Sequence, residues 1–124
     1  MKIIERLILS LGLVFLVIAV AIFRPVPIVQ EHKAIPVSGT VRYIFKGGVH
    51  DVVIKLEEDD RRFYINRGLE YGLDLDDLKD RLIGHQVVMK YPKYWTPLDW
   101  NNQVRHISKL EFQGEVLFNE LKSD

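Results

Sequence analysis

The chain of 124 residues contains no cysteine. This absence excludes disulfide bonds, thiolate metal sites and cysteine nucleophiles. It also excludes a membrane anchor made by attaching lipid to a cysteine after an apolar run. A chain without cysteine is compatible with either side of a membrane, so the missing residue type does not decide localisation.

Net charge is also missing, because 17 basic residues balance 17 acidic ones. Setting aside Lys2, Glu5 and Arg6 at the N-terminus leaves 15 basic and 16 acidic residues, so the remainder is close to neutral. A general binder of polyanions needs a basic surface. We therefore do not expect a nucleic acid as the partner of this protein.

Catalytic motifs are absent from the sequence. The four histidines show no metal-ligand spacing, and the serines lie in no nucleophile motif. The acidic run over residues 57–60 lacks the spaced oxygen ligands and the glycine of a calcium loop, so a solvated turn is expected there. We predict a protein that is not an enzyme, with no catalytic residue, no metal and no cofactor.

Charge is absent from one long apolar run, residues 7–23, which Arg6 and Arg24 enclose. About 17 residues is the short limit for a helix that crosses ~30 Å of hydrocarbon. Lipid offers no partners to free backbone groups, so such a run must be helical. We predict an N-terminal transmembrane anchor over residues 1–24, with the lipid bilayer as the partner of residues 7–23.

A cleaved signal peptide is the alternative interpretation of this run. Lys2 and Arg6 form a positive start, and Ala19-Val20-Ala21 fits the small-residue cleavage rule. The apolar run continues to Phe23, which favours an uncleaved signal-anchor. The distribution of basic residues favours a single-pass protein with its domain outside the cytoplasm, and the reverse orientation stays open.

Residues 25–36 are predicted to be a tether. Pro25, Pro27 and Pro36 lack an amide donor and fix φ, which disfavours a regular helix or a central strand. An extended chain rising ~3.1 Å per residue would hold the domain up to ~40 Å from the bilayer. His32 is expected to be solvated in this segment.

Residues 37–124 are predicted to be one β-rich domain. Alternating apolar residues predict strands over 37–46, 49–57, 62–66, 86–91, 104–113 and 115–118. Val41, Tyr43 and Phe45 should share one face, and Gly47-Gly48 predicts a hairpin. A β-bulge near Ser108-Lys109 is expected, because it lets the apolar residues on both sides face the core. Those residues are Ile107, Leu110 and Phe112.

Residues 74–84 are predicted to be the one helix of this domain. Asp74 can cap its N-terminus, and Gly84 suits a left-handed C-terminus. Leucines at helical spacing form an apolar stripe. The stripe comprises Leu75, Leu78 and Leu82. The predicted core comprises Val41, Ile54, Ile65, Leu78, Val87, Met89 and Leu110.

A helix between the third and fourth strands of a small five-stranded barrel resembles the OB-fold. The resemblance covers residues 37–112 and depends on element order, the Gly47-Gly48 hairpin and the entry into strand four over residues 82–88. It implies a mainly β domain with one helix, closed as a barrel that protects its sheet edges. An SH3-like barrel and an open α+β sheet are the alternatives.

The same resemblance implies that the loop after strand four, residues 92–102, is a binding element. The candidate binding residues are Lys93, Tyr94, Trp95, Trp100, Arg105 and His106. Aromatic side chains here can stack on bases or sugars, anchor a protein interface or lie at lipid headgroups. Alternatively, Trp95 and Leu98 plug the end of the barrel. We predict Trp95 to be the plug and Trp100 the exposed contact residue.

Two functions are compatible with this sequence. The first is a membrane-anchored binding or assembly module that recruits a protein partner. The alternative is a tethered receptor for a sugar or a cell-envelope polymer, for which the aromatic loop would supply the contacts.

Overall fold

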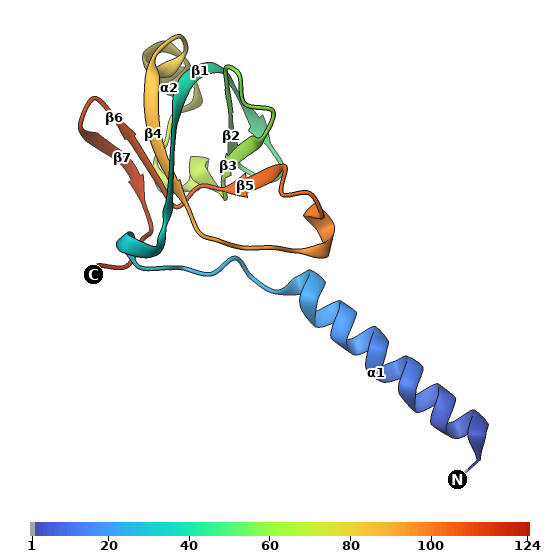
Figure 1. The fold of residues 1–124 in the computed structure, drawn as a ribbon. Coiled ribbons are helices and arrows are strands. Elements are labelled where there is room, and N and C mark those ends of the chain that lie inside the picture. Colours follow the sequence, from blue (N-terminus) through green and yellow to red (C-terminus); the bar gives the residue numbers. More distant parts are fainter. Residues whose placement is uncertain (1) are drawn as a thin grey trace.

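The computed structural model describes residues 2–124, which form an apolar helix followed by a β-rich domain (Figure 1). The sheet has seven strands in the order β5-β3-β2-β1-β4-β6-β7. Two α-helices and three short 3-10 helices make up the other regular elements of residues 2–124. The bounds are α1 Ile3–Phe23, η1 Glu31–Lys33, β1 Ile35–Gly47, β2 Asp51–Leu56, β3 Arg62–Ile65, η2 Gly68–Tyr71, α2 Leu75–Leu82, β4 Gln86–Tyr91, η3 Pro97–Asp99, β5 Val104–His106, β6 Lys109–Phe112 and β7 Glu115–Asn119.

Helix α1 projects away from the domain (Figure 1). It has 21 residues, and at 1.5 Å per residue it is about 31 Å long, close to the thickness of a bilayer's hydrocarbon. None of its side chains is buried, and the helix continues past Ala21 to Phe23. The predicted helix is confirmed, and it is long and apolar enough to cross a membrane.

Strand β1 pairs with two different neighbours along its length. Residues 35–40 pair antiparallel with β4, and residues 41–47 pair antiparallel with β2. The register of the second pairing shifts between Val41 and Tyr43, which reverses the alternation of side chains. Ile44 is therefore buried, while Tyr43 is 44% exposed. The prediction that Val41, Tyr43 and Phe45 share one face is wrong for this reason.

The predicted strand over residues 104–113 is divided in two. β5 runs parallel to β3, and β6 runs antiparallel to β4. The link between them still hydrogen-bonds on both sides, because the Ile107 amide donates to the Tyr64 carbonyl (2.8 Å) and the Ser108 amide donates to the Lys90 carbonyl (2.8 Å). The seven-stranded sheet is open, so the predicted closed five-stranded barrel is not confirmed.

The core joins buried residues of the strands to Leu78 and Leu82 of α2. All predicted core residues are at most 1% exposed. Ile107 and Leu110 are fully buried and Phe112 is 8% exposed, which confirms the prediction that these three side chains face the core. The Asp74 side chain accepts a hydrogen bond from the Asp77 amide at 2.9 Å, which confirms the predicted N-cap.

The segment after α1, predicted to be a tether, pairs with the domain over part of its length. Gln30 forms a parallel β-bridge with Lys122, whose amide donates to the Val29 carbonyl (3.0 Å) and whose carbonyl accepts from the Glu31 amide (3.1 Å). Strand β1 begins at Ile35, so Pro36 lies inside a strand. The tether finds its partner at the opposite end of the chain, and residues 29–36 are consequently held on the domain.

Side chains strengthen this attachment. The Glu31 carboxylate accepts hydrogen bonds from Lys90 and Lys109, each at 2.8 Å. Both hydrogen bonds hold the pKa of Glu31 below its ordinary value, and the bond from Lys109 has the larger effect. His32, predicted to be solvated, donates its backbone amide to the Asp124 carboxylate at 3.0 Å, and its ring also pairs with that carboxylate. The backbone bond and the ring together lower the pKa of Asp124.

Acid should release the tether from the domain. A carboxylate whose pKa is lowered in the folded protein stabilises it above the ordinary pKa, and that stabilisation is lost as the pH falls through the folded value. We expect the exchange of the Glu31 and Lys122 amides, corrected for intrinsic rates, to accelerate as the pH falls below the ordinary Glu31 pKa of 4.5. A Glu31→Gln variant should show fast exchange already at neutral pH. Equal protection of both amides in the two proteins would contradict this prediction.

Leu78 joins α2 to the core, and Leu78→Ala should destabilise the domain by about 2–4 kcal/mol, as large-to-small core changes do. The measurement is denaturant unfolding of residues 29–124, which retain the paired tether. Asp80, on the exposed face of α2, is the matched control, and Asp80→Ala should change stability by less than about 0.5 kcal/mol. A cost below about 1 kcal/mol for Leu78→Ala would mean that the α2 stripe contributes little to the core.

Candidate functional site

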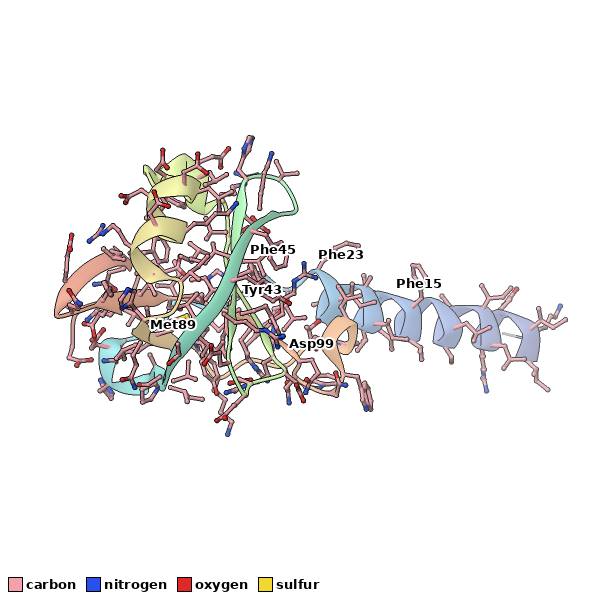
Figure 2. The ribbon with its side chains drawn as sticks, turned by 90° about the horizontal axis from the view of Figure 1, so that it is seen from above. Phe15, Phe23, Tyr43, Phe45, Met89 and Asp99 are labelled. Atoms are coloured by element: carbon pink, nitrogen blue, oxygen red, sulfur yellow. The ribbon has the colours of Figure 1, made fainter. Side chains whose placement is uncertain are left out.

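The predicted site residues surround the loop between β4 and β5, residues 92–103, hereafter the aromatic loop. The loop lies beside the C-terminal end of α1 (Figure 1). Seen from above, Asp99 of η3 lies next to that end of the helix (Figure 2). The site is therefore located where the apolar helix meets the domain.

Arg24, the first charged residue after the apolar run, attaches the aromatic loop to α1. Its guanidinium donates to the Trp95 carbonyl at 3.0 Å, and its own carbonyl accepts from the Tyr94 hydroxyl at 2.8 Å. The guanidinium carbon also lies 4.8 Å from the centre of the Tyr94 ring, within cation–π range. Arg24 thus holds the Trp95 carbonyl and the whole Tyr94 side chain of the loop.

Asp99 organises the loop from within. Its two carboxylate oxygens accept from the Gln103 and Val104 amides, each at 2.9 Å, which joins η3 to the start of β5. Thr96 precedes Pro97 and its hydroxyl caps η3. Arg105 donates to the Tyr94 carbonyl at 2.7 Å and ties the first half of the loop to β5. The loop has little regular structure and is nevertheless held at several points.

Large apolar side chains on this loop remain exposed. Trp95, Leu98 and Trp100 are 43%, 72% and 74% exposed. The two indole rings meet edge to face with centroids 5.1 Å apart, and the Trp95 N–H donates to the Trp100 carbonyl at 3.1 Å. The prediction that Trp95 is a buried plug is wrong, because its ring packs on Trp100 at the surface and not in the core. Trp100 is the more exposed of the two, as predicted.

Two hollows flank the loop. A cavity of about 290 Å³ lies between α1 and the domain, lined by Ile22, Val26, Tyr64, Tyr94, Leu98 and His106, among others. An open groove of about 650 Å³ lies next to it. We call it the basic groove, and its lining includes Arg24, Arg61, Lys93, Trp95 and Arg105.

Most of the positive charge of the basic groove is not neutralised. Arg61 pairs with Asp59 at 2.9 Å, and the hydrogen bond from this guanidinium lowers the pKa of Asp59. Over residues 2–124, by contrast, no carboxylate forms an ion pair with Arg24, Lys93 or Arg105. The groove therefore has a local positive potential although the whole chain is neutral.

His106 faces the cavity on the other side of the loop. One ring nitrogen pairs with the Glu120 carboxylate, and the ring meets Tyr64 edge to face at 5.4 Å. Its Nδ1 and the Ser108 hydroxyl are buried without a hydrogen-bond partner. Among the residues that the structure describes, no three potential metal ligands come together. His106 thus ties the segment after β7 to β5, and its surroundings resemble no metal site.

The structure brings most of the predicted residues together. Lys93, Tyr94, Trp95 and Arg105 line the basic groove, Trp100 packs against Trp95, and His106 lies in the neighbouring cavity. Sequence reasoning missed Arg24, Arg61 and Asp99. Arg24 and Asp99 carried a signal, because the first follows the apolar run and the second completes a Thr-Pro-Leu-Asp helix start.

Comparison of the chain with protein-family models, curated proteins and solved structures finds no match.

Removing the Asp99 carboxylate should loosen the aromatic loop. Asp99→Ala loses two hydrogen bonds to a charged acceptor, and we expect a cost of about 1–3 kcal/mol. The Gln103 and Val104 amides should exchange faster, which hydrogen exchange followed by mass spectrometry would detect. Asn101→Ala is the matched control, because the Asn101 side chain is exposed and only its carbonyl receives a hydrogen bond. Unchanged protection of both amides in Asp99→Ala would contradict the role of Asp99.

Proposed function

We propose that this chain is a single-span membrane protein whose β-rich domain lies outside the cytoplasm and acts as a non-enzymatic binding or assembly module. The domain recruits a protein partner at the membrane. The observation that carries this proposal is the double attachment of the domain to the end of α1. Arg24 holds the aromatic loop, and residues 29–32 are held by β4, β6 and the C-terminal segment.

A domain attached in this way keeps one orientation relative to its helix. Flexible linkers suit domains that search a volume, whereas a fixed domain presents the same surface continuously. Fixing that surface in advance also lowers the entropy lost when a partner binds. These properties favour an assembly module over a domain that captures diffusing ligands.

Strand β7 is the surface that we propose for the partner. It is the last strand of the sheet and pairs with β6 alone. Val116 on this strand is 48% exposed, and Tyr71, which is 66% exposed, packs on Phe118 with ring centroids 5.9 Å apart. An edge strand offers backbone hydrogen bonds to an added strand, and adjacent apolar side chains add contact area.

We further propose that the domain has OB-like topology. β1, β2 and β3 follow one another as antiparallel neighbours, and α2 lies between β3 and β4. Two residues separate β5, which pairs with β3, from β6, which pairs with β4. Read as one interrupted strand, residues 104–112 connect the two sides of the sheet, which supports a barrel-like arrangement.

The alternative, a receptor for a sugar or cell-envelope polymer, is favoured by one observation, the basic groove. Its unneutralised cations fit an anionic polymer. The tryptophan geometry does not favour a neutral sugar, because the two rings meet edge to face and offer no common flat platform.

A photoreactive residue in place of Val116 should cross-link a protein in native membranes, while the same residue in place of Asp80 should not. Mass spectrometry identifies the product, and adding a glycan mixture at saturating concentration should leave the cross-link unchanged.

The full-length chain should resist carbonate extraction from membranes. A C-terminal fusion to a phosphatase that is active only after export from the cytoplasm should be active in cells.

Each result addresses a separate part of the proposal. A mature N-terminus at Ile22 would contradict the anchor, and an inactive phosphatase fusion would contradict the orientation. Absence of a protein cross-link at Val116 in membranes that hold the intact chain would contradict strand addition at β7.

A further inference from the structure

We infer that the aromatic loop is the contact of the domain with the bilayer surface. In this inference Trp95, Leu98 and Trp100 enter the lipid interface, and the basic groove takes the phosphate groups of anionic phospholipids. The inference rests on the proposed function in one respect, which is that α1 spans the bilayer.

The depth of the loop follows from its contact with α1. A helix of about 31 Å that crosses ~30 Å of hydrocarbon places its last turn at the boundary with the headgroups. Ile22 in that last turn shares the 290 Å³ cavity with Leu98 and Asp99 of η3. The loop therefore lies at the level of the headgroups whenever α1 spans the membrane. Figure 1 shows η3 as the part of the domain nearest to the helix.

The exposed side chains of the loop are of the types that this level favours. Tryptophan concentrates at both interfaces of a membrane, where its ring is half in contact with lipid and half with water. Phe23 in the last turn of α1 is 83% exposed and adds another apolar side chain at this end of the helix. Exposed apolar residues gathered on one loop mark an interaction surface, and here the neighbouring surface is the bilayer that α1 crosses.

Several polar groups of the loop already have partners within the loop or at the start of β5, which lowers the cost of leaving bulk water. The Trp95 N–H donates to the Trp100 carbonyl, and the Asp99 carboxylate accepts from the Gln103 and Val104 amides. A polar group brought towards lipid without a partner would oppose insertion. Internal bonding removes much of that opposition before the loop reaches the membrane.

The basic groove supplies the complementary charge. Arg24, Lys93 and Arg105 line it without forming an ion pair with any described carboxylate. Anionic lipids attract basic groups close to the membrane surface, and phosphate oxygens accept their hydrogen bonds. The loop thus presents exposed apolar side chains next to a group of cations, which suit the acyl chains and the phosphates of a lipid leaflet.

The tryptophans themselves provide the test, because the chain has two and both are in this loop. The full-length protein is placed in lipid nanodiscs whose acyl chains carry bromine near the headgroup, which quenches fluorescence on contact. Trp95→Phe and Trp100→Phe each leave a single tryptophan. The control carries both phenylalanines and Asp80→Trp on α2, at the end of the domain far from α1 (Figure 1).

Both loop tryptophans should lose fluorescence in brominated discs, with Trp100 losing more, and both should be shielded from acrylamide in the water. The control tryptophan should keep its fluorescence and remain accessible to acrylamide. Raising the share of anionic phospholipid should deepen the quenching, and Lys93→Glu should abolish that dependence. Both faces of a nanodisc are open, so the result does not depend on orientation in the cell.

The outcomes separate this inference from the proposed anchor. Protein that stays out of the discs would overturn the spanning helix and the inference with it. Protein that enters the discs with loop and control tryptophans equally unquenched would overturn the inference and leave the anchor intact. Shielding by an added anionic polymer or a protein partner, without quenching by lipid, would assign the loop to that macromolecule instead. Quenching that does not respond to anionic lipid would overturn the role of the groove.

Discussion

Strand β1 changes partners at Val41, and the arrangement of the rest of the sheet depends on this change. A strand that leaves one neighbour for another exposes backbone groups at the crossing, which must find other partners. Here the Val41 amide donates to the His85 carbonyl at 2.9 Å, and the Val41 carbonyl accepts from the Gly84 amide at 2.8 Å. Gly84 makes this contact with φ of +83°, a conformation that suits glycine. The end of α2 is thereby fixed at the crossing, and β4 starts from it.

A single carboxylate fixes the segment between α1 and β1 on the domain. Glu31 lies just before β1 and joins two lysines that belong to different strands, Lys90 of β4 and Lys109 of β6. Lys109 also pairs with Glu111 at 3.1 Å, so the charges form a small network and not an isolated pair. A network that is partly shielded from water loses less to screening than an exposed pair does. It holds the chain that follows α1 against β4 and β6.

Local patterns were sufficient to predict much of this structure. The apolar run, the capped helix at Asp74 and the core positions from Val41 to Leu110 follow from periodicity and turn chemistry within short windows. The misplaced face of β1 has a different origin, because the irregularity at Arg42 has no composition signal such as glycine. The paired tether could not be predicted, since its partner Lys122 lies at the other end of the chain.

The aromatic loop shows the same division within the candidate site. Its residues were identified from composition and from their place after the fourth strand, and their mutual contacts follow from short separations such as that of Asp99 and Val104. Its location beside α1 depends on Arg24, which is about seventy residues away in sequence, as the Tyr94 hydrogen bond records. Contacts of that separation are decided by tertiary packing, which single-sequence patterns do not contain.

The pairing of Gln30 with Lys122 has a mechanical consequence. The chain enters the domain and leaves it at the same place, with two short segments running in the same direction (Figure 1). A pull on α1 loads this junction along the segments, so its hydrogen bonds and the Glu31 network resist together before the force reaches the strands behind them. If membrane tension or a moving neighbour drags the helix, the Arg24 contacts with the aromatic loop are loaded first and the junction next, and loss of both lengthens the connection. The junction would open before the core unfolds, so that the domain could move away from its helix and stay folded.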